Sequence, residues 1–216
     1  MKLALYHAPR ACSMVTLMTL HESGAEFELR PVNTRSGATR SAEYLRVNPK
    51  GKVPALEIDG RTLTENIAIL AWIAKAFPSA KLMPADDEGW FRALSLMAWC
   101  GSTLHPILPR MNFPQQYCEV PGTADSVHRL AMTDLVRQMN VAESLVSGRE
   151  WLLDHFTLVD LYLWWVWYRA TIPNVNMDKG AFPAMAAYAA RVEKRDSVQK
   201  ALVLATELEG QFAKTR

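Results

Sequence analysis

The chain has 216 residues, of which 50% are hydrophobic and 21% are charged, and its formal net charge is +2. This composition is ordinary for a folded globular protein of one or two domains, and the charge is too small to favour nucleic-acid binding. Its three cysteines are an odd number without framework spacing, which argues against a disulfide scaffold and for a reducing compartment. Lys2 precedes a strand-like segment, so we do not expect a signal peptide.

Strands and helices are predicted to alternate through the first 77 residues. Residues 1–6 alternate weakly and predict a strand, and the apolar stretch 14–20 predicts a helix. That helix is expected to stop at Gly24, a residue type suited to helix ends. Residues 27–32 predict a second strand. The alternation favours an α/β layer architecture.

The segment from residue 48 to residue 70 carries the most informative pattern. A loop with the sequence Asn-Pro-Lys-Gly-Lys-Val-Pro ends at Pro54, directly before two apolar residues. A proline is tolerated at the first residue of a strand, and a cis bond before it is possible. Asp59-Gly60 lies between strand-forming residues and predicts a hairpin turn. Glu65-Asn66 then places an acid and an amide at the start of a helix.

Beyond Pro84 we expect helices and no strand. Asp86-Asp87-Glu88 predicts an acidic helix start, and residues 113–124 predict a loop. The aromatic run 161–168 is bracketed by charged residues and is too short to span a membrane. The expected helices cover residues 87–112, 125–147, 157–171, 182–194 and 196–213.

The pair of segments Val53-Pro54 and Glu65-Asn66 resembles the glutathione site of the cytosolic glutathione transferases, a thioredoxin-like family. In that family the loop before a cis-proline offers its backbone to the cysteinyl part of glutathione. A Glu-Ser pair at the next helix holds the γ-glutamyl end. Asn66 stands where the family more often has Ser, and its amide can still donate and accept hydrogen bonds.

Ala-Cys-Ser at the opening of the first helix is similar to the beta-class enzymes of bacteria, in which a cysteine faces the glutathione sulfur. The positive end of a helix favours a thiolate, so a depressed pKa is expected for Cys12. The alternative for Cys12 is a small buried residue without chemistry. Ser13 is the second candidate for the group that faces the sulfur, and Tyr6 is the third.

The resemblance also implies roles for other residues. Beta-class enzymes carry a His-Lys pair near His105, but Pro106 replaces the lysine here and is expected to end or kink the helix. His105 is expected near the site, although a structural histidine is the alternative. Arg35 and Lys52 are candidate partners for a glutathione carboxylate, and each is otherwise a solvated loop charge.

Thr157-Leu158-Val159-Asp160 has the form of a capping box, in which two residues three positions apart exchange hydrogen bonds at a helix start. Transferases of this fold carry a Ser/Thr-x-x-Asp box at a buried helix of the second domain. Thr157 and Asp160 are therefore expected to serve folding and not catalysis, and they extend the resemblance across nearly the whole chain.

The expected fold is an α/β thioredoxin-like domain followed by an all-helical domain. Residues 1–78 form the glutathione-binding domain, 79–86 the linker, and 87–216 the helical domain that contributes the electrophile pocket. The resemblance implies a cytoplasmic homodimer that conjugates the glutathione thiolate to an electrophilic small molecule, as in detoxification. Glutathione is then a co-substrate, and no separate cofactor, metal, nucleic acid or membrane partner is expected.

Two other functions remain open at this stage. Cys12 could serve a glutathione-dependent thiol–disulfide reductase, by a one-cysteine route because no second cysteine stands at C-x-x-C spacing. The chain could also be a non-catalytic glutathione-binding or scaffold protein of the same fold, since Asn66 and Pro106 depart from the family pattern.

Overall fold

The structure is a computed structural model that describes residues 1–173, 175 and 177–214. Its contacts divide the chain into two compact units. The first combines Met1–Met83 with Lys194–Arg216, and the second is Pro84–Glu193. The chain thus changes unit after Met83, within the segment 79–86 that was expected as the linker. The last helix, expected in the helical domain, groups with the first unit, because it packs against the first helix of the chain.

A four-stranded sheet forms the centre of the first unit. Its strands are β1 (Leu3–His7), β2 (Glu28–Pro31), β3 (Ala55–Ile58) and β4 (Arg61–Thr64), in the order β2-β1-β3-β4. β1 and β2 are parallel, whereas β3 is antiparallel to both β1 and β4. The sheet is therefore mixed, as in thioredoxin-like domains.

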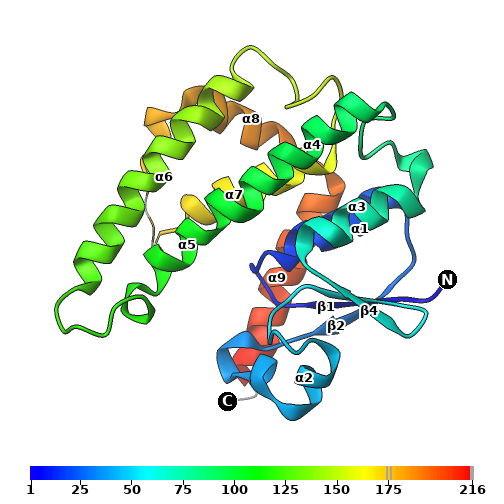
Figure 1. Cartoon of the computed structure of the whole chain (residues 1–216), viewed down its shortest axis with the longest axis horizontal. Helices are drawn as coiled ribbons and strands as arrows, with labels where there is room; N and C mark the ends of the chain where they lie inside the picture. The colour runs from blue at the N-terminus through cyan, green and yellow to red at the C-terminus, as the bar shows by residue number, and fades with distance from the viewer. Residues whose placement is uncertain (174, 176, 215–216) are drawn as a thin grey trace. The chain divides into compact units, whose positions relative to one another are not determined.

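Four helices surround this sheet: α1 (Ser13–Ser23), α2 (Ala42–Val47), α3 (Asn66–Ala76) and α9 (Asp196–Lys214). Figure 1 shows α1 and α3 on one face of the sheet and α2 beyond the other. Leu5 of β1, Leu17 of α1 and Leu56 of β3 are nearly or fully buried and belong to the core of this unit. Gly24 ends α1 in the left-handed conformation (φ 71°), as expected, and its N–H bonds the carbonyls of Leu20 and His21.

The hairpin expected around Asp59-Gly60 is confirmed. β3 and β4 pair from Ala55 with Thr64 to Ile58 with Arg61, which leaves a two-residue turn. Asp59 and Gly60 both have positive φ, 47° and 81°. The type I′ hairpin turn requires positive φ at both positions, and Asp-Gly is a sequence that supplies it.

The second unit is helical in the described residues. Its helices are α4 (Asp87–Trp99), a π-helical turn (Cys100–Leu104), α5 (His105–Asn112), α6 (Ala124–Val146), α7 (Leu158–Ala170) and α8 (Pro183–Glu193). α7 is buried along nearly its whole length and packs against α4, α5, α8 and the π-helical turn. Short 3-10 turns occur in both units: Thr34–Ser36, Ala38–Arg40 and Pro78–Ala80 in the first, and Pro114–Gln116 and Lys179–Ala181 in the second. Across the residues with described structure, no helix is both long enough and apolar enough to cross a membrane.

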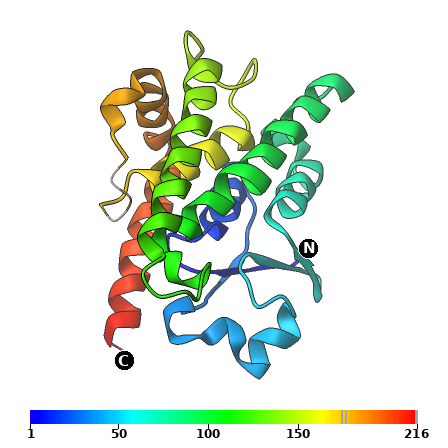
Figure 2. The ribbon, with the colours of Figure 1, turned by 60° about the vertical axis from the view of Figure 1, so that its left-hand side comes forward.

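Pro106 does not end the helix in which it lies, and the helical stretch expected over residues 87–112 continues through it with a local change in its turns. α4, the π-helical turn and α5 follow each other as one rod, which is visible in Figures 1 and 2. The N–H of His105 bonds the carbonyl of Cys100, five residues back. This wider turn lies directly before Pro106, which has no N–H to donate. The helix therefore passes the proline by changing its hydrogen-bond pattern.

The buried start of α7 has the arrangement expected for Thr157 and Asp160. The Asp160 carboxylate accepts hydrogen bonds from the Thr157 N–H (2.7 Å) and the Thr157 hydroxyl (3.0 Å). It also accepts bonds from the Leu152 N–H (3.0 Å) and the Tyr188 hydroxyl (2.5 Å). Asp160 is fully buried, so these four donors replace the water that a carboxylate would otherwise bind.

Candidate active site

The fold brings the Cys12 region and the Val53-Pro54 loop together. Cys12 is the N-cap of α1, and its thiol donates a hydrogen bond to the Val53 carbonyl at 3.4 Å. The Val53–Pro54 peptide bond is cis. Cys12 and Val53 are both partly exposed, whereas Pro54 is buried. The start of α1 and the loop before Pro54 thus meet at a place that is partly open to solvent.

The pKa of Cys12 is not depressed, contrary to the expectation from its place at a helix start. Burial raises the pKa of the thiol to about 12. The backbone N–H groups of Cys12 and Ser13 and the charge of Lys52 act in the opposite direction but do not offset burial. Cys12 is therefore a protonated thiol at neutral pH, able to donate a hydrogen bond.

The loop that presents Val53 is held by two side chains that the sequence did not indicate. The Tyr44 hydroxyl and the Asn48 amide donate to the Lys52 carbonyl at 2.8 and 2.6 Å. Asn48 also accepts a hydrogen bond from the Lys50 N–H at 3.1 Å. The Lys52 side chain itself is exposed. The first half of the predicted motif thus has a backbone held by side-chain hydrogen bonds and an exposed cation beside it.

Glu65 is placed to receive a cationic group. It is the N-cap of α3 with a positive φ of 73°, and its side chain is exposed. The Lys50 ammonium forms an ion pair with one of its carboxylate oxygens. The two residues of the motif thus differ in environment: the Glu65 side chain is exposed to solvent, whereas Asn66 is buried.

Asn66 does not present its amide to a ligand, which corrects the role expected for its side chain. Its oxygen accepts a hydrogen bond from the Thr16 hydroxyl at 2.7 Å, and its nitrogen donates to the Cys12 carbonyl at 3.2 Å. The side chain thus joins α3 to the start of α1. As the first residue of α3, Asn66 still contributes a backbone N–H to the open end of that helix.

Ser13 cannot face a ligand in this conformation, which corrects its place among the catalytic candidates. It is fully buried, and its hydroxyl lies 2.9 Å from Nδ1 of His7. Burial lowers the pKa of His7 to about 4, so the ring is neutral at physiological pH. The hydroxyl also accepts a hydrogen bond from the Ala8 N–H at 3.1 Å.

Tyr6 is directed away from the start of α1. Its hydroxyl accepts a hydrogen bond from Arg30 at 2.8 Å, and its ring packs edge-on against Tyr44. Arg30 is in turn paired with Glu28 and Glu57. Successive residues of β1 point to opposite faces of the sheet, and Leu5 occupies the face that α1 covers. Cys12 therefore remains as the candidate side chain of this unit for the glutathione sulfur.

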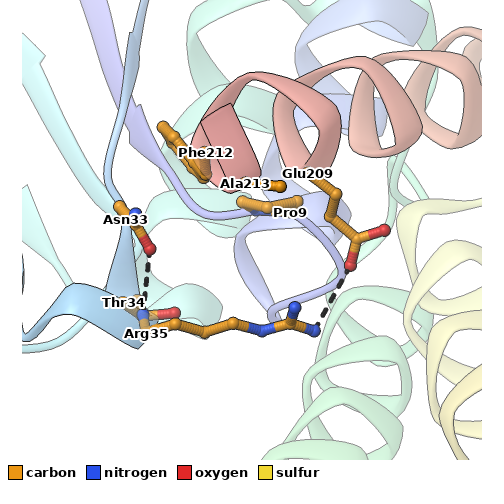
Figure 3. Close-up of a pocket in the computed structure, with 7 residues that line it drawn as sticks. All are labelled: Pro9, Asn33, Thr34, Arg35, Glu209, Phe212 and Ala213. Carbon is orange, nitrogen blue, oxygen red and sulfur yellow. Dashed lines mark hydrogen bonds and ion pairs between the residues drawn. The ribbon is translucent and has the colours of Figure 1, made fainter. Parts of the chain in front are cut away.

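Arg35 lies beside a small pocket between the loop after β2 and the end of α9 (Figure 3). Its guanidinium pairs with Glu209 at 3.6 Å and is 72% exposed. Glu209 makes a closer ion pair with Arg10, at 2.8 Å. The Asn33 side chain accepts a hydrogen bond from the Arg35 N–H at 3.1 Å. The exposed guanidinium can exchange its loose partner for a ligand carboxylate, since surface pairs of this kind are weak.

His105 lies in the second unit, at the start of α5. Its Nδ1 is 3.5 Å from the Tyr162 hydroxyl, and its ring meets Trp165 edge-on with centroids 4.8 Å apart. These contacts position the ring from α7. The expected approach of His105 to the glutathione sulfur stays a prediction.

Among the residues that the structure describes, no three His, Cys, Asp or Glu side chains gather as metal ligands would. All three cysteines are free thiols.

Comparisons with known proteins identify the family. The family model "Glutathione S-transferase, N-terminal domain" matches residues 1–75. A zeta-class glutathione S-transferase of Euphorbia esula is 37% identical over 193 residues, which cover 85% of this chain and 82% of that protein.

Solved structures are similar over most of the chain. The structure of a sphingomonad glutathione S-transferase complexed with glutathione has a TM-score of 0.82 and 33% identity, covering 94% of this chain and 98% of that one. A beta-class enzyme of Sphingomonas chungbukensis has a TM-score of 0.81 with the same identity and coverage. The chain therefore belongs to the glutathione S-transferases, a family of transferases with a thioredoxin-like domain followed by helices.

Proposed function

We propose that this transferase binds glutathione at the start of α1 and conjugates its thiolate to an electrophilic small molecule. The observation that carries the proposal is the Cys12 thiol on the Val53 carbonyl, at a partly exposed place where the open ends of α1 and the loop before Pro54 meet. Similarity to the glutathione complex of the sphingomonad enzyme supports the ligand.

Each residue of the site has a distinct task in this proposal. The backbone of Val53, held by its loop, pairs with the cysteinyl part of glutathione. Glu65 accepts hydrogen bonds from the γ-glutamyl ammonium, which displaces the Lys50 ammonium. Arg35 and Lys52 meet the carboxylate at the glycyl end. The N–H of Asn66 adds to the positive end of α3, which favours the γ-glutamyl carboxylate.

The reaction itself requires a glutathione thiolate. When Val53 pairs with glutathione, the Cys12 S–H loses its partner and turns to the glutathione sulfur, where it stabilises the anion as a hydrogen-bond donor. The proton of the glutathione thiol passes to solvent. The thiolate lone pair then forms a C–S bond to the electrophilic carbon, and the leaving group departs with the electron pair of the bond that breaks. Cys12 is neither oxidised nor alkylated.

The helical part of the chain supplies the second substrate in this proposal. We assign the electrophile pocket to residues 87–193, and His105 is a second donor to the glutathione sulfur. Tyr162 and Trp165, both on α7, contact the His105 ring and orient it.

Disulfide reduction is the second candidate activity, because Cys12 is a partly exposed cysteine beside a glutathione-binding loop. Thiol–disulfide exchange starts from a thiolate, and the raised pKa of Cys12 opposes its formation. Conjugation, in which Cys12 keeps its proton, is therefore the activity that the site favours.

The remaining context follows the family resemblance. We propose a homodimer, the commonest closed assembly, that works in the cytoplasm in detoxification with glutathione as its co-substrate and without a further cofactor. The three free thiols support a reducing compartment. Sedimentation that gives a single 24.3 kDa species at micromolar concentration would contradict the dimer.

The two activities are separated by measuring both on the wild type and Cys12→Ala. One assay follows conjugation of glutathione to a dinitro-activated aryl chloride, and the other follows reduction of a mixed disulfide with glutathione. We expect conjugation in the wild type, with a partial loss in Cys12→Ala because other donors remain. A wild type that neither conjugates nor is retained on immobilised glutathione would refute the proposal.

A further inference from the structure

His7 and Ser13 make a buried contact at the two ends of the loop that carries Cys12. His7 is the last residue of β1 and Ser13 is the first residue of α1, and both are 0% exposed. Nδ1 of His7 and the Ser13 hydroxyl oxygen are 2.9 Å apart. The contact therefore closes the chain around residues 8–12.

The same hydroxyl also holds the first residue of the loop. It accepts a hydrogen bond from the Ala8 N–H at 3.1 Å and lies 3.3 Å from the Ala8 carbonyl oxygen. The Ala8 carbonyl in turn accepts a hydrogen bond from the Ala11 N–H at 3.2 Å. Arg10, in the middle of this loop, has a positive φ of 59°. The loop thus has a tight and specific backbone path, and the Ser13 hydroxyl is the buried group that joins its two ends.

The two nitrogens of the His7 ring are not equivalent. Nδ1 forms a hydrogen bond with the Ser13 hydroxyl. Nε2 is buried and has no hydrogen-bond partner among the residues that the structure describes. A buried polar atom without a partner destabilises the folded state. An apolar side chain would fill the same space without that cost. The hydrogen bond through Nδ1 is therefore the polar interaction by which the His7 ring can stabilise this part of the structure.

We propose that His7 and Ser13 are positioning residues that hold Cys12 in place for glutathione. The name "His7–Ser13 latch" is used below for their contact together with the Ala8 bonds of the Ser13 hydroxyl. The choice of glutathione as the ligand rests on the proposed function, but the positioning of Cys12 does not.

Loss of the latch has a defined consequence for Cys12. The thiol reaches the Val53 carbonyl only at 3.4 Å, and the Cys12 carbonyl is held by Asn66 at 3.2 Å. These contacts constrain Cys12 itself, while the latch joins the two ends of the loop that carries it. Without the latch the loop gains alternative paths, and the Cys12 sulfur spends less time at Val53. Small displacements of a reacting group lower rates strongly.

Two isosteric substitutions of His7 test which nitrogen matters. In His7→Asn the side-chain amide can replace Nδ1, and in His7→Gln it can replace Nε2. Ser13→Ala removes the hydroxyl alone, and His21→Gln is the matched control, because that ring packs against Phe27 and not against the loop. We measure kcat and KM for conjugation per folded molecule, and the alkylation rate of Cys12 by peptide mass mapping without glutathione.

We expect His7→Gln and Ser13→Ala to lower kcat/KM about tenfold and to raise Cys12 alkylation by a similar factor, whereas His7→Asn stays within about threefold of the wild type. The double variant His7→Gln/Ser13→Ala should lose no more than either single variant. Equal losses in His7→Asn and His7→Gln, or unchanged alkylation in Ser13→Ala, would overturn the latch. If the wild type fails to bind glutathione, the proposed function falls, and the alkylation rates still decide on the latch.

Discussion

At the scale of single residues, the state of Cys12 results from two opposing influences. The start of α1 and Lys52 favour a thiolate, but enclosure by protein atoms and the S–H bond to Val53 favour the thiol. Position in the sequence shows the first influence only, because enclosure depends on residues more than forty positions away. The identity of Cys12 as a site residue could be proposed from the sequence, whereas its protonation state could not.

Alkylation of the cysteines at different pH values checks this state. Because burial raises the pKa of Cys12 to about 12, its reaction with iodoacetamide should increase up to and beyond pH 10 without a plateau. Cys118 should react first, since hydrogen bonds from Thr123 and Val120 lower the pKa of its thiol. Mass spectrometry of the Cys12 peptide measures the alkylation rate at each pH. A rate that reaches a plateau below pH 9 would show that the helix start outweighs burial in setting the pKa of Cys12.

Glu65→Ala should weaken glutathione binding without affecting folding. The carboxylate is exposed and pairs with Lys50, so its loss costs little stability. In the complex it would bind the γ-glutamyl ammonium, and hydrogen bonds to charged groups contribute roughly 1.5–3 kcal/mol, which corresponds to about a 10- to 150-fold loss of affinity. Calorimetric titration measures this loss. Glu43→Ala, another exposed glutamate of the same unit, is the control and should bind like the wild type.

The sequence motif also contained two residues whose expected contacts were wrong. Ser13 and Asn66 have polar side chains at the expected helix starts, but both are buried and bonded within the protein. Residue type shows that a side chain can form hydrogen bonds and not which partner it has. The partners of these two, His7 and Thr16, lie on neighbouring elements that only the folded chain brings together.

At the scale of elements, the parts set by local chemistry could be predicted. Gly24 and Asp59-Gly60 supply backbone conformations that few other residues adopt, so the end of α1 and the hairpin followed from the sequence. The π-helical turn did not, because Pro106 alone indicates a kink. The surroundings of the helix, which include its packing against α6 and α7, decide whether the rod continues.

Two helix caps of the second unit should differ in strength. Asp86 caps α4 with one exposed hydrogen bond to the Gly89 N–H at 2.8 Å, whereas Asp160 accepts four buried bonds. Asp86→Ala should lower the free energy of unfolding by about 1 kcal/mol. Asp160→Ala should lower it by more than about 3 kcal/mol, because it leaves several buried donors unpaired. Chemical denaturation measures both values.

Glutathione affinity per folded molecule should be unchanged in either cap variant. An Asp160→Ala protein with normal stability and weak glutathione binding would contradict the structural role of this residue.

The contact between α1 and α9 predicts a pH dependence of stability. Glu22 forms a two-bond ion pair with Arg195 (2.8 and 2.7 Å) and accepts a bond from Ser197 (2.5 Å). Burial raises the pKa of Glu22, but these bonds outweigh it and the net pKa is lowered. A lowered folded-state pKa means that the stabilisation is complete above the unfolded-state pKa of about 4.3 and disappears as the pH falls further.

Glu22→Gln should therefore be less stable than the wild type at pH 7, by about 1–2 kcal/mol, and the difference should narrow below about pH 4. Urea denaturation at a series of pH values measures it, with the exposed Glu26→Gln as the control. A difference that grows in acid would reverse the assigned direction of the pKa shift.

At the scale of the whole molecule, the sequence showed the change from strands to helices but not the return of the last helix. In the sequence, α9 resembles the helices before it. The periodicity of its apolar residues shows that one face is buried but not which element covers that face. Its packing against α1, with the ion pairs Arg195–Glu22 and Arg10–Glu209, places it in the first unit. The end of the chain thus contributes to the unit that carries the glutathione site.

A crystal structure of the protein with glutathione tests the central claim most directly. The account predicts the glutathione sulfur within hydrogen-bond distance of the Cys12 sulfur, the cysteinyl backbone paired with Val53, and the γ-glutamyl ammonium on Glu65 in place of Lys50. Glutathione bound elsewhere, with the Cys12 thiol still on the Val53 carbonyl and Glu65 still paired with Lys50, would contradict it.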